Sequence, residues 1–165
     1  MNTKTLKLLI DTNVWIDYYT GRDTEDSQSS RLVKKLLCSK HDVLASALST
    51  KDLFYLLQAY LKLAYRKQHG EAPSSDQALA MNEVSWKCTE HMIAAAKLVS
   101  VETAECRRAL ELREYSNDYE DSVIVACAES CGADYIVTND KSLHAPETVS
   151  VVSAGELHVL LFERS

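Results

Sequence analysis

The sequence predicts an α/β protein whose central parallel sheet is covered by helices on both faces. Short apolar runs alternate along the chain with longer segments whose apolar residues recur at helical spacing. No two apolar runs are joined by the short turn that marks a β-hairpin. Only four glycines and two prolines occur in 165 residues, which disfavours a β-sandwich or a repeat array. Strands that alternate with helices in this way form parallel sheets.

The first predicted elements lie at the N-terminal end of the chain. Residues 7–10 form a short apolar run that predicts a buried strand, and residues 13–19 predict a helix directly after it. Residues 23–30 are rich in Ser, Asp and Glu and predict a polar connection. Residues 31–38 predict the next helix, because four apolar side chains recur there at helical spacing.

The middle of the chain is dominated by helical patterns. Residues 42–45 predict a second strand. Six apolar side chains form one stripe from residue 49 to about residue 67, which predicts a long amphipathic helix. Residues 68–75 contain a glycine and a proline and predict a loop. Residues 76–96 are helical in pattern, in one piece or in two.

The last third of the chain repeats the alternation of strands and helices. Gly132 is expected to end one of these helices as a C-terminal cap. The predicted strands cover residues 98–101, 133–138 and 149–152. The predicted helices cover residues 103–112, 117–131 and 153–162.

Length and composition predict a single domain over residues 1–165, long enough to bury a core. The content of 46% hydrophobic and 25% charged residues matches a globular protein. No segment reaches the roughly 18 apolar residues that span a bilayer, and no apolar region follows the N-terminal lysines. Five cysteines without paired spacing fit reduced thiols. We therefore expect a cytoplasmic protein with no membrane partner.

The net charge of −6 argues against tight, nonspecific binding of nucleic acid. The balance is uneven along the chain, however, and two stretches are rich in lysine and arginine. A small basic rim around an acidic centre therefore stays open as an interpretation. The two stretches contain Lys34, Lys35 and Lys40, and Lys62, Arg66 and Lys67.

Four aspartates that lie far apart in the sequence point to the function. Asp11 and Asp140 each follow an apolar run, so two parallel strands would bring them to one carboxyl edge of the sheet, where open α/β sheets keep their sites. Asp121 opens a helix that leads into the second of these strands, and Asp52 lies near the start of the long helix. Two carboxylates roughly 5 Å apart repel each other by about 3 kcal/mol at an effective dielectric near 20. Their convergence therefore indicates a divalent cation between them.

Each of these aspartates also has a structural explanation. Asp11 could cap the helix that follows the first strand, and Asp140 could form a turn. Asp52 fits a capping box that begins at Ser49.

The segment from Asn117 to Asp121 needs the same comparison. Asn117 and Glu120 resemble a capping box, which assigns Glu120 a structural role. Asp118 either complements the helix dipole or joins the site. Asp121 heads the apolar stripe that faces the sheet, where a charge needs a partner.

Three polar residues adjoin the expected site, namely Thr12, Asn13 and Thr138. They could orient a carboxylate or hold a metal-bound water. Ordinary turn chemistry would explain them equally well.

Three segments together resemble the PIN domain family. They are Leu-Ile-Asp-Thr-Asn-Val at residues 9–14, Asp-Tyr-Glu-Asp at residues 118–121 and Gly-Ala-Asp-Tyr-Ile-Val-Thr-Asn-Asp at residues 132–140. Each motif is weak alone, but three in this order and spacing are specific. The resemblance extends over essentially the whole chain, and residues 149–161 look like the last strand and helix of that fold. Residues 63–88 are not covered by the motifs.

The resemblance implies a three-layer α/β/α fold and a metal-dependent nuclease that acts most often on RNA. Small bacterial members are frequently VapC-type toxins, so it also implies the toxin of a type II toxin–antitoxin pair, an antitoxin partner and a homodimer. Asp11, Asp121 and Asp140 match three acidic positions of the family site. Asp52 stands where the family usually has Glu, one methylene shorter.

The carboxylates suggest a metal and a division of roles. Hard oxygen ligands suit Mg²⁺ or Mn²⁺. Asp11 and Asp121 are the expected main ligands, with Asp118 beside them, while Asp52 and Asp140 would bind a second ion or orient a water. No histidine is placed by the sequence to act as a general acid.

Two rival interpretations stay open. A phosphatase of the haloacid dehalogenase type also has an Asp after its first strand, but it needs a second Asp two residues later, where this chain has Asn13. The other rival is a catalytically degenerate PIN-like domain that acts as a protein- or RNA-binding module.

Overall fold

The structure is a computed structural model that describes residues 4–22 and 27–163. Within them, one sheet has the strand order β3-β2-β1-β4-β5, and all four neighbouring pairs are parallel. The predicted parallel sheet is therefore confirmed. The strands are β1 (Lys7–Ile10), β2 (Asp42–Ser46), β3 (Lys97–Val99), β4 (Tyr135–Val137) and β5 (Ser150–Val152).

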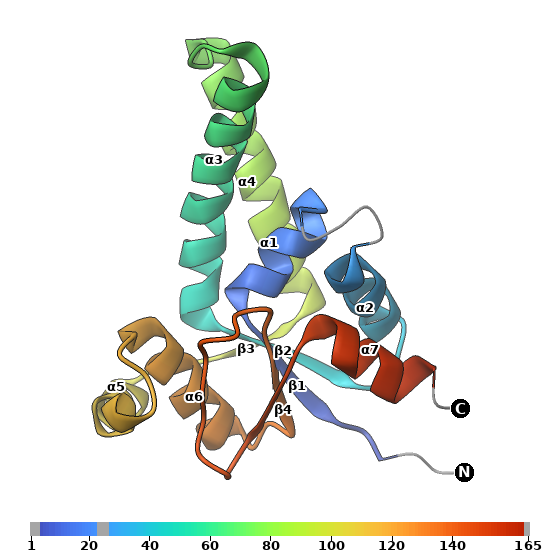
Figure 1. Cartoon of the computed structure of the whole chain (residues 1–165), viewed down its shortest axis with the longest axis vertical. Helices are drawn as coiled ribbons and strands as arrows, with labels where there is room; N and C mark the ends of the chain where they lie inside the picture. Colours follow the sequence, from blue (N-terminus) through green and yellow to red (C-terminus); the bar gives the residue numbers. More distant parts are fainter. Residues whose placement is uncertain (1–3, 23–26, 164–165) are drawn as a thin grey trace.

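Helices cover both faces of this sheet, with α5 and α6 on one side and α2 and α7 on the other (Figure 1). Successive strand side chains point to opposite faces. Leu8 and Ile10 accordingly join a core with α1, α2, α3, α4 and α7, while Leu9 joins a second core with α5 and α6. The three-layer arrangement is confirmed. The helices are α1 (Thr12–Thr20), α2 (Gln28–Leu37), α3 (Ala47–His69), α4 (Ser75–Ala95), α5 (Thr103–Glu111), α6 (Tyr119–Cys131) and α7 (Ala154–Phe162), with a 3₁₀ turn at Leu112–Glu114.

The helices α3 and α4 form a hairpin that extends well beyond the sheet (Figure 1). At 1.5 Å per residue, the 23 residues of α3 span roughly 35 Å. Gly70 ends α3 in the left-handed conformation, and Ser74 caps α4 through a capping box with Gln77. The segment 76–96 is thus part of one continuous helix and not two. No described helix is long and apolar enough to cross a membrane.

Several predicted boundaries were wrong by a few residues, mostly at helix starts. Residues 28–30 of the predicted polar connection form the first turn of α2, because the Ser27 hydroxyl caps it; residues 23–26 lie outside the described part. The long helix begins at Ala47, since Ser46 caps it in place of Ser49. The first strand has its predicted range, and each boundary of the remaining elements lies within two residues of the predicted one.

The order of the strands locates the site. The chain moves outward from β1 through β2 to β3 and then returns to place β4 on the other side of β1. The carboxyl ends of β1 and β4 therefore flank the point at which the strand order reverses, where open α/β sheets bind ligands.

Candidate active site

Asp11 lies at this reversal point, directly after β1, and is only 7% exposed. Its backbone N–H donates to the carbonyl of Val137 at 3.0 Å, which extends the β1–β4 pairing by one residue. Its carboxylate accepts hydrogen bonds from the Thr12 amide at 2.6 Å, Asn13 Nδ2 at 2.6 Å and Thr138 Oγ1 at 2.8 Å. Asp11 is the N-cap of α1, as the structural alternative proposed, and it also faces a cavity.

Thr138 and Asn13 connect the ends of the two central strands. Asn13 Nδ2 donates to Thr138 Oγ1 at 2.9 Å, and Asn13 Oδ1 accepts from the Asn139 amide at 3.0 Å. Thr138 Oγ1 also accepts from the Asp140 amide at 3.0 Å. The Asp140 carboxylate accepts from the amide and the hydroxyl of Ser142. These bonds fix the backbone that carries both aspartates.

The first turn of α6 supplies the other carboxylates. Asp118 caps the helix, because its Oδ1 accepts from the Glu120 amide at 2.8 Å. The capping box predicted from Asn117 and Glu120 is therefore wrong, and the Glu120 side chain has no capping role. Asp121 accepts a hydrogen bond from the Ser116 hydroxyl at 3.2 Å.

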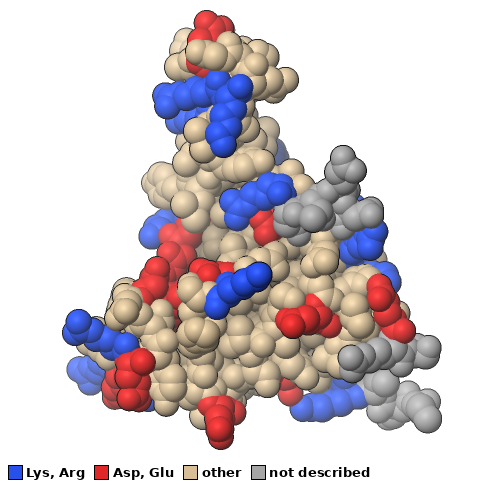
Figure 2. Space-filling view, viewed as in Figure 1, with Lys and Arg blue, Asp and Glu red and all other residues tan. Residues whose placement is uncertain are grey.

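A cavity of about 250 Å³ brings these groups together. Figure 2 shows acidic side chains gathered at the foot of the α3–α4 hairpin, with several lysine and arginine side chains around them. The structure thus unites four predicted site residues, Asp11, Asp118, Asp121 and Asp140, with Thr12 and Asn13. The lining residues are Asp11, Thr12, Asn13, Ile16, Arg22, Leu56, Asp118, Glu120, Asp121 and Asp140.

The carboxylates perturb one another. Burial raises the pKa of Asp11 to about 6, the hydrogen bonds from Thr138 and Thr12 oppose this rise, and the charges of Asp121 and Asp140 add to it. Burial, with the neighbouring Asp118 and Asp140, likewise raises the pKa of Asp121. Asp140 differs, because its hydrogen bonds from Ser142 lower its pKa. Carboxylates with raised pKa values that share a cavity make it a candidate functional site.

The family model of the PIN domain matches residues 7–142 of this sequence, which is most of the chain. The chain belongs to the PIN domain family. This agrees with the residues that carried the resemblance.

Two kinds of relative extend the comparison. Ribonuclease VapC1 of Aquifex aeolicus (strain VF5) is 24% identical over 153 residues, which cover 91% of this chain and 92% of that protein. Among solved structures, VapBC2 from Rickettsia felis bound to a DNA fragment from its promoter has a TM-score of 0.61 at 14% identity and covers 90% of this chain and 98% of that one. A toxin–antitoxin complex from Klebsiella pneumoniae has a TM-score of 0.58 at 17% identity, covering 89% and 97%. These structures share the PIN fold.

Asp52 is the predicted carboxylate of the PIN site that does not line the cavity; Thr138 does not line it either but hydrogen-bonds to Asp11. Asp52 lies in the second turn of α3, too far from the cap at Ser46 for the capping role that the sequence allowed. Its carboxylate pairs with Lys51 Nζ at 2.9 Å. It still lies close to the site, because its charge contributes, after burial, to raising the pKa of Glu120.

Sequence reasoning missed three residues of this PIN site. Glu120 lines the cavity, and burial together with the charges of Asp52, Asp11, Asp118 and Asp121 raises its pKa. Arg22 lines the same cavity and pairs with the buried Asp17. His144 also lies near Asp121. Its charge lowers the pKa of Asp121, although burial has the larger effect and the pKa is raised. Glu120 was detectable from its place in the Asp-Tyr-Glu-Asp motif, whereas Arg22 and His144 lie in no motif.

The donor set suits a hard divalent cation. In residues 4–22 and 27–163, no three Asp, Glu, His or Cys side chains already converge as ligands on one point. The cavity nevertheless holds several mutually repelling carboxylates and the buried Thr12 hydroxyl, which has no hydrogen-bond partner. A cation with its bound water would satisfy both the charges and this hydroxyl.

Proposed function

We propose that this protein is a divalent-metal-dependent endoribonuclease that hydrolyses phosphodiester bonds of RNA. The observation that carries the proposal is the buried Asp11 carboxylate, which shares one cavity with Asp121 and Asp140 at the reversal point of the sheet. The similarity to a protein named Ribonuclease VapC1 supports RNA as the substrate class.

The residues of the cavity would hold Mg²⁺ or Mn²⁺ as the cofactor. Asp11, Asp121, Asp118 and Asp140 are the proposed ligands, and the bound ion would lower the pKa of a water and stabilise charge on the scissile phosphate. Thr138 and Asn13 keep the Asp11 carboxylate in one orientation. The Ser142 hydrogen bonds keep the Asp140 carboxylate charged at the mouth of the site.

Two further residues have proposed roles of their own. Glu120 lines the acidic cavity, whereas Asp52 does not line it and is paired with Lys51. We propose that Glu120 and Asp52 share the role predicted for Asp52 alone, which is to bind a second ion or to orient the water.

The biological setting is proposed to be that of a toxin in a type II toxin–antitoxin pair, acting in the cytoplasm. Support comes from the likeness to VapBC2 of Rickettsia felis and to the Klebsiella pneumoniae toxin–antitoxin complex. An antitoxin protein is the proposed partner. Self-association as a homodimer stays a prediction.

The decisive experiment is cleavage of end-labelled single-stranded RNA with Mn²⁺ or Mg²⁺, with matched reactions in EDTA. The Asp121→Asn variant should lose cleavage by at least about 100-fold while it keeps its fold, because a charged group of the site is removed. Asp76→Asn is the matched control, since Asp76 also lies in the first turn of a helix but is exposed and on α4.

The outcomes separate the alternatives. Metal-dependent cutting that Asp121→Asn loses and Asp76→Asn keeps supports the proposal. Cutting by Asp121→Asn at the wild-type rate contradicts it. If the protein does not cut RNA and is not stabilised by the metal in a melting assay, the degenerate binding module is favoured.

A further inference from the structure

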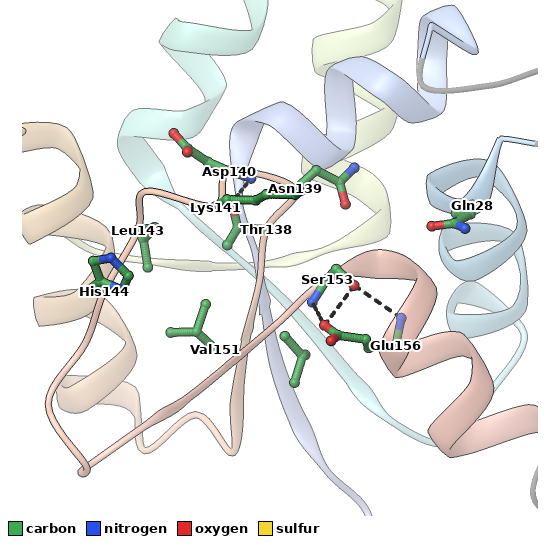
Figure 3. A pocket seen from close by; sticks show the side chains of 11 residues that line it. Gln28, Thr138, Asn139, Asp140, Lys141, Leu143, His144, Val151, Ser153 and Glu156 are labelled. Carbon is green, nitrogen blue, oxygen red and sulfur yellow. Dashed lines mark hydrogen bonds between the residues drawn. The ribbon is translucent and has the colours of Figure 1, made fainter.

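A second cavity, of about 490 Å³, lies beside the acidic cavity at the carboxyl ends of β4 and β5. Figure 3 shows its side chains around the space between the loop after β4 and the first turn of α7. Asp140 lines both cavities, so the two cavities adjoin at this residue. Its volume lies in the range of about 300–1,000 Å³ that holds small organic molecules.

The walls of this cavity combine an apolar surface with unused polar groups. Leu143, Val151 and Val152 provide the apolar part. Lys141 and His144 stand on the loop side, and within the described part of the chain neither side chain hydrogen-bonds to another residue. The cavity therefore offers apolar surface for a flat ring, and the Lys141 ammonium offers a positive charge for an anion.

Other polar groups of the cavity are already occupied and serve to shape it. The Asn139 carboxamide donates to Asp17 and Ser29 and accepts from the Ala154 amide. The Glu156 carboxylate accepts from the amide and the hydroxyl of Ser153 (Figure 3). The Ala154 bond holds the loop after β4 against the start of α7, and the Asp17 and Ser29 bonds hold it against α1 and α2. The Ser153–Glu156 bonds cap α7 itself.

Gln28 is a further polar group that remains available for a ligand, and a glycine makes room for it. A Cβ atom at Gly155 would lie 2.3 Å from Gln28 Oε1 and 2.8 Å from its Cδ. Glycine is less favourable than alanine in a helix by about 1 kcal/mol. The missing side chain at Gly155 thus leaves the Gln28 carboxamide lying across α7 at the edge of the cavity. Within the described residues, this carboxamide has no hydrogen-bond partner.

We propose that this second cavity binds the nucleoside next to the scissile phosphate of a single-stranded RNA. The apolar wall would contact the face of the base, and the Gln28 carboxamide, which both donates and accepts, would bind the base edge. Lys141 would meet the adjoining phosphate. Only an unstacked base can enter such a cavity, which selects single strands over duplexes. The proposal rests on the proposed function for the acidic cavity.

Binding is tested without any cleavage, by titrating the four nucleoside 5′-monophosphates into the full chain in EDTA. Methyl resonances are followed by NMR in protein labelled at Leu and Val methyl groups. The signals of Leu143, Val151 and Val152 should shift and saturate with at least one nucleotide, while Leu63 on the distant hairpin stays unchanged. If none of the three signals shifts, the proposal is overturned.

Substitution provides the second test. Gly155→Ala should displace the flexible Gln28 side chain and leave the protein at least as stable as the wild type. The KM for RNA should rise about tenfold with little change in kcat, as expected for loss of hydrogen bonds to the ligand. Gln28→Ala should do the same, whereas Gln68→Ala at the end of the α3–α4 hairpin should not.

Failure of this proposal can be told apart from failure of the proposed function. Metal-dependent RNA cleavage with an unchanged KM in both Gly155→Ala and Gln28→Ala contradicts the nucleoside site alone. Saturating methyl shifts in a protein that cuts no RNA support the site and contradict the nuclease.

Discussion

At the scale of single residues, Asp11 shows how one side chain serves structure and chemistry together. It caps α1, which stabilises the helix, and it carries a carboxylate that is almost completely buried. Its three hydrogen bonds offset part of the cost of burial, yet its pKa is still raised to about 6. The remaining cost is what a bound cation would remove.

The first prediction concerns the pH dependence of this cost in Asp11→Asn. The ordinary pKa of Asp11 is 3.8 and its folded value is about 6. Between these values the unfolded chain releases the proton first, so the contribution of Asp11 to the free energy of unfolding falls as the pH rises. The side chain that replaces Asp11 does not titrate. The free energy of unfolding of Asp11→Asn should therefore increase relative to that of the wild type from pH 4 to pH 7, by at most about 3 kcal/mol.

Urea denaturation of both proteins in EDTA, at several pH values, measures this difference. The same series with Mn²⁺ should reduce the relative gain above pH 6, because the ion stabilises only the charged wild-type site. A stability difference that stays constant from pH 4 to pH 7 would contradict the raised pKa.

Glu120 gives a second residue-scale prediction. Glu120→Gln keeps the side-chain volume and removes one charge from the cavity, so metal affinity or kcat should fall about 10- to 100-fold. Steady-state cleavage across a range of Mn²⁺ concentrations measures the change. Glu114→Gln, an exposed residue of the 3₁₀ turn, is the matched control and should behave as wild type. Equal activity of both variants would show that Glu120 takes no part in the site.

At the scale of elements, α6 determines the site through its two ends. Its first turn carries Asp118, Glu120 and Asp121, and its last turn leads into β4. Gly132 makes this connection tight, because its φ of 63° lies in the left-handed region and its N–H bonds back to the helix. The Ala133 amide also returns to the Ala128 carbonyl at 2.9 Å. The position of the acidic turn thus depends on how the helix ends.

Gly132→Ala supplies the prediction at this scale. Nothing lies within 4 Å of a Cβ there, so the cost comes from backbone strain alone, about 1 to 2 kcal/mol. The melting temperature should fall by about 2 to 8 °C. Gly132→Asn should lose less, since Asn adopts this conformation more readily. Differential scanning calorimetry measures both, and equal loss in the two variants would argue against strain as the cause.

At the scale of the whole molecule, charge shapes how RNA can approach. The chain carries a net charge of −6, and acidic side chains gather at the foot of the α3–α4 hairpin (Figure 2). Arg22 lines the acidic cavity and Lys51 and Lys141 adjoin it, and none of the three belongs to the two basic stretches that the composition singled out. Lys62, Arg66 and Lys67 lie farther out along α3. A few cations around an anionic centre attract phosphate only locally.

The corresponding prediction is a shallow salt dependence. If about three cations contact phosphates, the logarithm of kcat/KM for RNA should fall against the logarithm of salt concentration with a slope near −2. Cleavage assays from low to moderate KCl at constant Mn²⁺ measure the slope, and Lys141→Met should reduce its magnitude by about one. A slope steeper than about −6 would indicate a large basic surface that these charges do not provide.

The amino-acid sequence by itself determined the parallel α/β fold, and it placed Asp11, Asp121 and Asp140 at one edge of the sheet. Apolar periodicity and strand ends are local features, and a parallel sheet needs only their order to bring these residues together. Helix starts were less predictable, because several serines close together could each cap, as Ser46 and Ser49 show.

Only the tertiary structure decided which side chains meet across elements. It turned Glu120 toward the site, paired Asp52 with Lys51, and seated Gln28 over Gly155. Whether such side chains come into contact depends on how the helices pack and on which neighbouring group pairs with each charge. Sequence spacing carries no such information between distant segments, because it records distance along the chain and not the approach of side chains in space.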